Sequence, residues 1–326
     1  MAHRKIIYLI NPISGTRGKR SLKELITRRT QQEGIEFSIL PTDADGNYAF
    51  LIPVIEKDGV TDIVICGGDG TVSAVAAAMT GRDVRIGIIP MGSGNGLAFA
   101  AGIPKDPSEA LDILFAGNAT WIDGFLINGK FSCMLCGIGF DGGVAHQFAR
   151  EAKRGLRTYV KVTLTHFFRA RCYSFRIDLP DTSFPVEAFF IDIANGNQFG
   201  NNVTIAPRAD LHDGLLDIVI VKKASRLRLL LSATRQVLGG YKMTATPVDA
   251  GTKKVLYFQT PGLVIANPEG APLHIDGDPA PSAGEFRVEI VPKAIRLIQP
   301  RERVSVRYTR AKGTNELGEG RSPAKF

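Results

Sequence analysis

The stretch ICGGDGTVSAVAAAM, from Ile65 to Met79, decides the predicted fold because a short apolar strand ends in glycines and a helical pattern follows. Glycine lets backbone N–H groups approach a phosphate closely, and the N-terminus of the next helix favours negative charge. The loop Gly67–Gly70 is therefore predicted to bind phosphate after a strand at Ile63–Cys66. The apolar residues that follow recur at the spacing of one helix face, namely Val72, Val75, Ala76 and Met79.

Two further units with the same order flank this one. Repeated strand, glycine loop and helix units predict a parallel sheet whose loops gather at the carboxyl ends of the strands. A ligand is therefore expected at that edge of the sheet. The first unit is the strand 5–10, the loop NPISGTRG at 11–18 and the helix 21–33, and the third is the strand 86–89, the loop PMGSG at 90–94 and the helix 95–101.

From about Asn128 the pattern changes to short β-rich runs separated by turn residues, such as SFRIDLP, LLDIVIV and GEFRVEIVP. Such runs predict an antiparallel sandwich or barrel. Two helical patterns interrupt them, over Val144–Phe168 and Arg226–Leu238. The predicted organisation is an α/β domain over residues 1–127, to which residues after about 294 are candidates to return, a β-rich domain over residues 128–293, and a basic tail over residues 301–326.

The composition, with 44% hydrophobic and 22% charged residues, is typical of a globular protein. No apolar run approaches the roughly 20 residues that cross a bilayer. The N-terminus MAHRKIIYLIN leads directly into a strand rather than into a cleavable signal. A cytoplasmic protein is therefore expected.

The formal net charge of +8 favours an anionic partner, such as nucleic acid, nucleotide phosphate or an acidic membrane. From Arg301 onward there are seven Arg or Lys residues and three Glu residues, and this segment is interpreted as a solvated end. Nucleic acid is not expected as a partner, because no binding motif accompanies the charge and aromatic residues do not interleave with it.

Four cysteines lie in apolar, strand-like segments, where free Cys commonly behaves as a small hydrophobe. The CMLC spacing of Cys133 and Cys136 is compatible with half of a zinc site, but no second pair stands at ligand spacing. Core packing is therefore the preferred interpretation of Cys66, Cys133, Cys136 and Cys172.

Asp69 stands in the middle of the predicted phosphate loop, where a carboxylate would repel phosphate unless a cation or a proton intervenes. Two roles in phosphoryl transfer fit it, a carboxylate linked to Mg²⁺ or a base that faces the attacking hydroxyl. A tight turn in which Asp only favours the geometry is the alternative. The loop matches neither GxxxxGK[ST] nor GxGxxG.

Taken together, the motifs resemble the catalytic domain of the diacylglycerol kinase and sphingosine kinase family of lipid kinases, particularly its soluble bacterial members. GGDGT also occurs in NAD kinases and phosphofructokinases, but the whole ordered set is specific. The resemblance implies a Rossmann-like parallel-sheet domain of the NAD kinase and diacylglycerol kinase type, followed by a β-sandwich domain with inserted helices. The motifs are NPISG (11–15), GGDGT (67–71), PMGSGNGLA (90–98), GIGFDG (137–142), ANGNQFGNNVTIAP (194–207), LHDGLLDI (211–218) and HIDGD (274–278).

The resemblance implies that ATP and Mg²⁺ bind at the glycine loops. An Asx turn before Pro12 is the alternative for Asn11, and capping of the third helix is the alternative for Ser93 and Asn95. The implied nucleotide-binding residues are Asn11, Thr42, Gly67, Gly68, Gly70, Thr71, Gly92, Ser93 and Asn95.

The resemblance also implies three catalytic carboxylates, on Asp69, Asp123 and Asp278. The family has Glu at the position of Asp278, whose shorter side chain keeps the charge but withdraws it by one methylene. Asp276 is a nearby substitute for this role. The alternatives are a turn carboxylate for Asp123 and a hairpin turn for residues 276–278.

The segment LHDGLLDI resembles one that holds a structural Mg²⁺ in some bacterial members, which implies Asp213 and Asp217 as metal ligands. His212 replaces a common acidic residue there, and an Asp-Gly turn is an equal alternative. Gly96 in GSGNG replaces the acid of the common GTxND pattern, which tilts the acceptor toward a sphingoid base. Asp141 is implied to meet an amino-alcohol headgroup, with a helix cap as the alternative.

The predicted activity is ATP-dependent transfer of the γ-phosphate to a hydroxyl of a lipid such as diacylglycerol or a sphingoid base. An NAD kinase-like enzyme and a non-catalytic nucleotide- or lipid-binding protein are the alternatives, the latter suggested by Gly96, His212 and Asp278. The expected partners are the lipid, the inner membrane surface and a second copy in a homodimer. Membrane contact would use the leucine-rich helix 226–238 and the basic residues Arg150, Lys153, Arg154 and Arg157, for which core packing and solvation are the alternatives.

Overall fold

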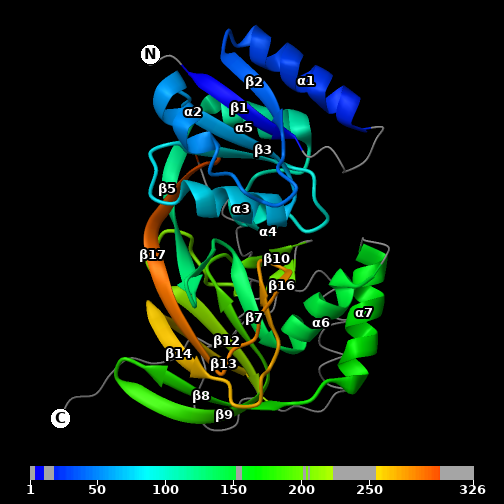
Figure 1. Ribbon diagram of the computed structural model, residues 1–326, viewed down its shortest axis with the longest axis vertical. Coiled ribbons are helices and arrows are strands. Elements are labelled where there is room, and N and C mark those ends of the chain that lie inside the picture. Colours follow the sequence, from blue (N-terminus) through cyan, green and yellow to red (C-terminus); the bar gives the residue numbers. More distant parts are fainter. Residues whose placement is uncertain are drawn as a thin grey trace, which may run out of the picture.

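The computed structural model describes residues 4–10, 18–151, 156–200, 203–204, 206–222 and 255–301. Two lobes stack along the long axis of the molecule (Figure 1). The upper lobe is built on a parallel sheet and the lower lobe on antiparallel strands, so the predicted α/β plus β architecture is confirmed. The predicted helix 226–238, the loop NPISGTRG up to residue 17 and the tail after residue 301 lie outside the described residues.

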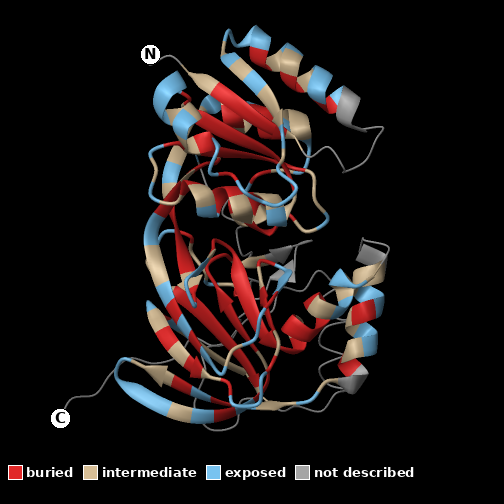
Figure 2. Cartoon of the chain, viewed as in Figure 1, coloured by how far each residue is buried: buried red, intermediate tan, exposed pale blue. Residues whose placement is uncertain are grey.

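The upper lobe has four parallel strands in the order β4, β3, β1, β2. Every residue of β3 is buried, which is typical of a parallel strand with helices on both faces. Figure 2 shows the buried strands between layers of helices whose outer surfaces are exposed. The strands are β1 (Lys5–Ile10), β2 (Glu36–Pro41), β3 (Asp62–Gly67) and β4 (Arg85–Pro90), and the helices are α1 (Gly18–Gln32), α2 (Leu51–Asp58), α3 (Asp69–Met79), α4 (Gly96–Ala100) and α5 (Pro107–Ala116).

Two of these helices, α2 and α5, were not predicted. The caps of α5 are nevertheless visible in the sequence. The side chain of Asp106 accepts hydrogen bonds from the N–H groups of Ser108 and Glu109, and Pro107 occupies the first helical position. Gly117 then ends the helix in the left-handed conformation, with φ of 67°.

The lower lobe is a set of antiparallel strands with a core that is separate from that of the upper lobe. Its central strand β9 pairs with β7, β8 and β12. The strands are β6 (Lys130–Ser132), β7 (Leu135–Gly139), β8 (Tyr173–Leu179), β9 (Thr182–Ala194), β10 (Gln198–Gly200), β11 (Val203–Thr204), β12 (Leu216–Lys222), β13 (Val255–Thr260), β14 (Gly262–Ala266), β15 (Leu273–Ile275) and β16 (Asp278–Ala280).

The cysteines lie in these cores. Cys66, Cys133 and Cys136 are buried and reduced, and burial raises the pKa of each thiol. The core-packing interpretation is confirmed for these three residues. Cys172 is half-buried.

The prediction of one helix over Val144–Phe168 is wrong. The chain forms α6 (Phe140–Ala149) and α7 (Leu156–Arg169), and α7 folds back so that the rings of Phe148 and Tyr159 pack with centroids 5.5 Å apart. Gly142 lets α6 approach the β15 segment, because a Cβ there would lie 2.1 Å from the carbonyl oxygen of Pro272. Packing against the sheet and against each other therefore decides where these helices begin and end.

Two long strands, β5 (Ala119–Ile127) and β17 (Glu285–Ile298), join the lobes as an antiparallel pair (Figure 1). In the lower lobe β17 pairs with β14, and in the upper lobe Arg296 and Leu297 pair in parallel with β4. The ladder is interrupted between Val291 and Ile295, where Lys293 has a positive φ of 51°. A single sheet therefore runs through both lobes.

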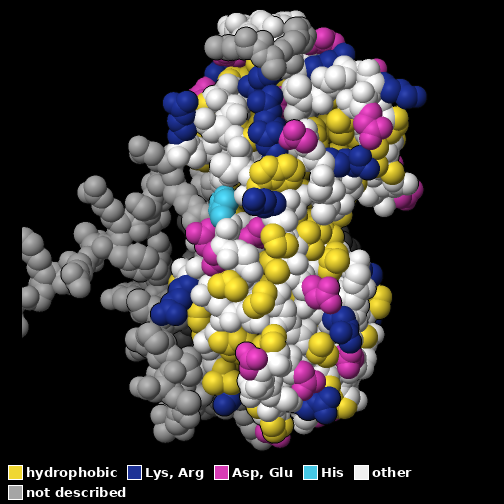
Figure 3. All heavy atoms as spheres, turned by 90° about the vertical axis from the view of Figure 1, so that its left-hand side faces the viewer, with side chains coloured by type: hydrophobic (Ala, Val, Ile, Leu, Met, Phe, Trp, Pro, Cys, Tyr) yellow, Lys and Arg dark blue, Asp and Glu magenta, His cyan; other side chains and the backbone are white. Residues whose placement is uncertain are grey.

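The surface drawn in Figure 3 mixes basic and acidic side chains of the described residues over both lobes rather than separating them by sign. Within the described part of the chain, no helix combines the length and the apolar character needed to span a bilayer.

Candidate active site

The loops after β3 and β4 pack backbone against backbone at the lower edge of the upper lobe. The N–H of Met91 donates to the carbonyl of Gly67 at 2.9 Å. A Cβ on Gly92 would lie 2.6 Å from the Cα of Gly68, and a Cβ on Gly68 would lie 3.0 Å from the Cα of Gly92. This approach therefore requires glycine at both positions, as expected where backbone amides must line a phosphate site.

Asn95 holds the second loop in shape. Its Oδ1 accepts from the N–H of Gly92 at 2.8 Å, and its Nδ2 donates to the carbonyl of Gly92 at 2.9 Å. Asn95 itself is left-handed, with φ of 57°, and its side chain makes no capping bond to α4. Asn95 therefore closes the PMGSG turn, while Ser93 at the tip is exposed.

Asp69 connects the two loops. It is the first residue of α3, and its carboxylate accepts hydrogen bonds from the N–H groups of Asn95 at 2.7 Å and Gly96 at 2.6 Å. Burial raises the pKa of Asp69 to about 6, against the opposing effect of these two donors. A Cβ on Gly94 would lie 2.5 Å from Asp69 Oδ2, so glycine also permits this contact.

Asp278 reaches the same place from the lower lobe. It begins β16 on an exposed turn, and its Oδ2 lies 3.0 Å from the position that a Cβ on Gly70 would occupy. Figure 1 shows β16 below the helices α3 and α4, at the junction of the lobes. The structure thus gathers carboxylates from both lobes around the N-terminus of α3, where Asp69 is the first residue.

Asp276, two residues earlier, is buried instead of exposed. Its carboxylate accepts hydrogen bonds from the hydroxyl groups of Ser73 in α3 and Ser132 in β6, the latter at 2.6 Å, and from the N–H of Leu135 at 3.1 Å. Burial raises its pKa above the ordinary value for Asp. Of the two carboxylates in HIDGD, Asp278 is therefore the one exposed beside the predicted phosphate loop.

Asp123 is buried in β5, where the lobes join. Its Oδ2 accepts from the N–H of Gly214 and its Oδ1 from the N–H of Lys293, both at 2.8 Å. The contacts of Asp123 therefore tie together three segments of the junction, and among the described residues its carboxylate makes no hydrogen bond to a glycine loop. Its catalytic role stays a prediction.

Three further residues were predicted to bind the nucleotide, namely Thr42, Thr71 and Asn11. The N–H of Thr42, which directly follows β2, donates to the carbonyl of Ile10 at 3.2 Å and so lies beside the end of β1. Thr71 lies in the first turn of α3, and a Cβ on Gly67 would contact its side chain at 3.1 Å. Asn11 lies outside the described residues.

The predicted metal ligands Asp213 and Asp217 share a hydrogen-bond donor. The side-chain amide of Gln259 donates to Asp213 at 3.3 Å and to Asp217 at 3.2 Å, and the hydroxyl of Tyr257 donates to the other oxygen of Asp217. Burial raises the pKa of Asp217. These donors satisfy the carboxylates without a cation, and the metal role stays a prediction.

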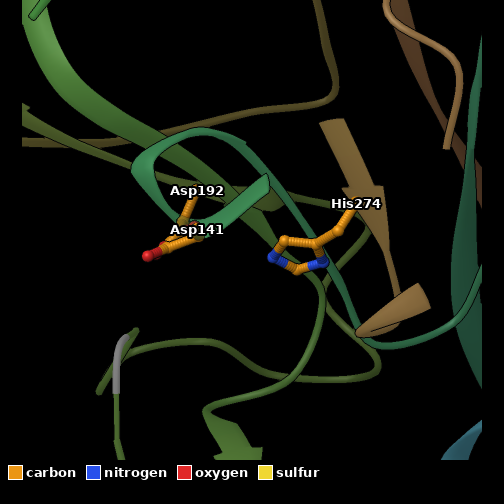
Figure 4. Close-up of side chains that lie close together, drawn as sticks. All are labelled: Asp141, Asp192 and His274. Carbon is orange, nitrogen blue, oxygen red and sulfur yellow. The ribbon is translucent and has the colours of Figure 1, made fainter. Parts of the chain in front are cut away.

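Asp141, the predicted headgroup contact, lies in a cluster with Asp192 and His274 (Figure 4). The register of β15, β7 and β9 places His274 and Asp192 on either side of Gly137. A Cβ on Gly137 would lie 2.4 Å from His274 Nε2 and 2.9 Å from Asp192 Oδ1, so glycine allows the pair to face each other. Asp141 joins them from the first turn of α6.

The two carboxyl groups of this cluster cannot both ionise easily. Asp192 is fully buried, and neither of its oxygens accepts a hydrogen bond from the described residues. Burial raises the pKa of Asp141 to about 6 and that of Asp192 well above its ordinary value, with the charge of Asp141 raising Asp192 further. We therefore assign a proton to Asp192, which donates it toward Asp141.

The ring of His274 is uncharged in this cluster. The N–H of Gly277 donates to Nδ1 at 3.2 Å, and burial lowers the pKa of His274 to about 4. The neutral ring therefore carries its proton on Nε2, the nitrogen that faces the carboxyl groups. Asp192 and His274 were not predicted as site residues, because only the strand register brings them to Asp141.

Comparisons with known proteins match both lobes of the chain. The model of the family described as "Diacylglycerol kinase catalytic domain" matches residues 5–127, and that described as "YegS C-terminal NAD kinase beta sandwich-like domain" matches residues 136–299. A protein of Mycobacterium tuberculosis (strain H37Rv) named "Diacylglycerol kinase" is 30% identical, over 91% of this chain and 96% of its own. A protein of Xanthomonas euvesicatoria named "Probable lipid kinase YegS-like" is 28% identical, over 83% of this chain and 89% of its own.

A solved structure has the same fold. The crystal structure of a putative diacylglycerol kinase from Bacillus anthracis superimposes with a TM-score of 0.73 at 19% sequence identity. The match covers 92% of this chain and 98% of that one.

Proposed function

Since this chain belongs to the diacylglycerol kinase family of lipid kinases, we propose that it transfers the γ-phosphate of ATP to the hydroxyl group of a lipid. The observation that carries this proposal is the position of Asp278. A carboxylate from the lower lobe lies against Gly70 in the phosphate loop of the upper lobe. Such a site can bring a hydroxyl held by one lobe to a phosphate held by the other.

The glycine loops supply the phosphate site. The contact between Gly68 and Gly92 leaves backbone N–H groups available around the start of α3, where the helix dipole favours negative charge. Asp69 contributes by binding the N–H groups at the start of α4, which fixes the second loop against the first. The triphosphate of ATP would lie across the two loops.

The carboxylates present fit a Mg²⁺ ion. Each oxygen of Asp69 accepts one N–H and retains a lone pair, and the oxygens of Asp278 are exposed beside Gly70. A hard cation prefers such oxygen ligands. When bound, Mg²⁺ would neutralise charge that develops on the transferring phosphate.

Asp278 is the residue that we propose to accept the proton of the lipid hydroxyl. It is exposed beside Gly70, whereas Asp69 is half-buried and Asp123 is buried. An ionised carboxylate within hydrogen-bond reach of the hydroxyl suits this role. The oxygen then attacks the γ-phosphate, ADP leaves, and a lipid phosphate forms.

Diacylglycerol is the first acceptor to test, because the Mycobacterium tuberculosis relative bears that name. A sphingoid base is the second. Its ammonium group would suit Asp141, which is partly exposed and whose neighbour Asp192 retains a proton. The two acceptors differ in headgroup charge, so a direct comparison of their rates tests the role of Asp141.

The proposal is tested by transfer of labelled γ-phosphate from ATP, with Mg²⁺, to mixed micelles of diacylglycerol, sphingosine, ceramide or monoacylglycerol, with NAD as a soluble control. The wild-type protein is expected to label one class of lipid. Asp69→Asn places an amide donor against the N–H of Asn95 or Gly96, so its turnover should fall by about 100-fold or more. Label in NAD instead of lipid would overturn the acceptor assignment, and a fully active Asp69→Asn would overturn the role of that residue.

A further inference from the structure

We propose that Asp276 is a positioning residue for phosphoryl transfer, which fastens the turn of residues 274–278 to helix α3 and so places Asp278 beside the phosphate loop. This inference rests on the proposed function of the same site. It assigns to Asp276 no contact with the nucleotide or the lipid, because its carboxylate is buried among donors from the protein itself.

The contacts of Asp276 come from both lobes. Ser132 and Leu135 donate to Oδ1 from β6 and β7 of the lower lobe, and the backbone N–H of Asp276 donates to the carbonyl of Leu135 at 2.9 Å. Ser73 donates to Oδ2 from α3 of the upper lobe. One side chain therefore bridges the lobes within two residues of Asp278.

The backbone of the turn adopts conformations that need such support. Asp276 has a positive φ of 51° and Gly277 a positive φ of 87°, and a non-glycine residue in the left-handed region is sparsely populated unless its surroundings hold it there. The N–H of Gly277 also donates to Nδ1 of His274 at 3.2 Å. The turn is thus held on one side by His274 and on the other by Asp276.

Helix α3 connects this anchor with the other half of the site. Ser73 lies four residues after Asp69, about one helical turn along the same rigid element. The bond from Ser73 to Asp276 therefore fixes Asp278 relative to the helix whose first residue orders the glycine loops. A displacement of about 1 Å can lower a rate by about 100-fold, so loss of this anchor should affect turnover more than binding.

The test is a double-mutant cycle with Asp276→Ala, Asp278→Ala and the double variant. Asp276→Ala should lower kcat by 10- to 100-fold, as expected of a misplaced group, with little change in the KM for ATP. The double variant should be no slower than Asp278→Ala, because Asp276 acts through Asp278. Independent, multiplying losses in the double variant would overturn the proposal.

Asp276→Asn distinguishes positioning from proton transfer. Its amide oxygen can still accept from Ser132 and Leu135, and its NH₂ can donate to the hydroxyl oxygen of Ser73. Most of the lost kcat should therefore return in Asp276→Asn relative to Asp276→Ala. An Asn variant as slow as the Ala variant would show that Asp276 is itself the proton acceptor and would overturn the positioning role.

Asn267→Ala is the matched control, since it removes a buried network of four hydrogen bonds to Ala271, Ser282 and Ala283 in the same lobe. It should lower Tm but leave kcat per folded molecule within about twofold, because it is not linked to α3. Equal losses of kcat in Asn267→Ala and Asp276→Ala would show that Asp276 only stabilises the fold, and would overturn its positioning role.

Amide hydrogen exchange tests the anchor without turnover. Amide exchange at residues 276–278 and at the start of α3 should increase in Asp276→Ala and not in Asn267→Ala. Unchanged exchange in Asp276→Ala would overturn the inference. A wild-type protein that labels no lipid would overturn the proposed function alone, since the exchange result stands apart from it.

Discussion

The carboxylate of Asp69 can stand in a predicted phosphate loop because its partners are backbone N–H groups of the neighbouring loop. It accepts from Asn95 and Gly96, so its negative charge is directed at the start of α4. The glycines around it make this possible, since a side chain at Gly94 would overlap its oxygen. Asp69, a carboxylate that is unexpected in a phosphate loop, therefore joins the loops after β3 and β4.

The raised pKa of Asp69 in the free protein predicts an acid limb in the pH profile of kcat/KM. Asp69 must be ionised to accept both N–H groups, and its pKa is about 6, so kcat/KM with diacylglycerol should fall roughly tenfold per unit below pH 6. The same raised pKa affects the free energy of unfolding in the opposite direction. The folded protein binds more protons than the unfolded chain between about pH 4 and 6, so the contribution of Asp69 to the free energy of unfolding decreases as the pH rises through that window.

Asp141 provides the control, because burial raises its pKa to about 6 as well. The acid limb should persist in Asp141→Asn when the acceptor is uncharged diacylglycerol. If the limb disappears in this variant, it belongs to the cluster of Asp141 and Asp192 and not to the phosphate loop.

Single residues show where sequence interpretation succeeds and where it stops. Asp278 was identified from its place in a motif, and the structure brings it to the phosphate loop although nothing in the sequence says how near it lies. Asp192 and His274 were missed because strand register, which is not written in local sequence, brings them across Gly137. Asp276 was considered only as a substitute for Asp278, because its burial and its bond to Ser73 depend on the packing of the two lobes.

At the scale of elements, the two glycine loops behave as one unit. Their backbones touch between Gly68 and Gly92, and Asn95 and Asp69 supply the side-chain bonds that hold them. The proposed nucleotide site should therefore be sensitive to small changes in either loop.

Gly92→Ala should separate the loops. Its new Cβ would lie 2.6 Å from the Cα of Gly68 and 2.9 Å from Asn95 Oδ1. The contact with Gly68 is with a backbone atom, so no change of side-chain rotamer can relieve it. The strain should amount to about 1–3 kcal/mol, which corresponds to a rise of roughly 5- to 150-fold in the Kd for ATP if the strain falls on the nucleotide-binding conformation. Isothermal titration calorimetry measures this Kd.

Gly284→Ala is the companion variant, because no atom lies within 4 Å of a Cβ at that position. Its Kd for ATP should equal that of the wild-type protein. An unchanged Kd in Gly92→Ala would show that the loop contact does not shape the nucleotide site.

The helices and strands were predictable to different degrees. Apolar runs followed by glycine-containing loops identified β1, β3 and β4, since a buried parallel strand is apolar along most of its length. The single helix predicted over residues 144–168 failed because apolar periodicity continues through both α6 and α7, and contacts such as that of Phe148 with Tyr159 decide the break. Helix α5 was missed although Asp106 and Gly117 mark its ends.

At the scale of the whole molecule, each lobe has its own hydrophobic core, but one β-sheet runs through both lobes. The strands β5 and β17 run through both, and the carboxylate of Asp123 fastens β5 to the interruption in β17 at Lys293. The cores do not divide at residue 127, because Phe125 and Ile127 of β5 pack in the lower core while Cys133 and Met134 pack in the upper core. A site at this junction depends on the relative position of the lobes, as the contact of Asp276 with Ser73 also indicates.

A fragment of residues 1–127 is expected not to fold stably. It would retain β1 to β5 but lose the pairing of β17 with both β4 and β5, which leaves strand edges exposed. Size-exclusion chromatography should show aggregates, and thermal unfolding followed by circular dichroism should lack a cooperative transition. A monomeric fragment that unfolds cooperatively would contradict this expectation.

The pairing of Leu297 with Ile86 also has a consequence for biosynthesis. The ribosome delivers the amino-terminal strands first, yet the partner of β4 emerges only after more than 200 further residues have been added. During that interval the growing chain carries an unfinished edge that a chaperone could shield. The upper lobe is therefore the first to be synthesised and among the last to be completed.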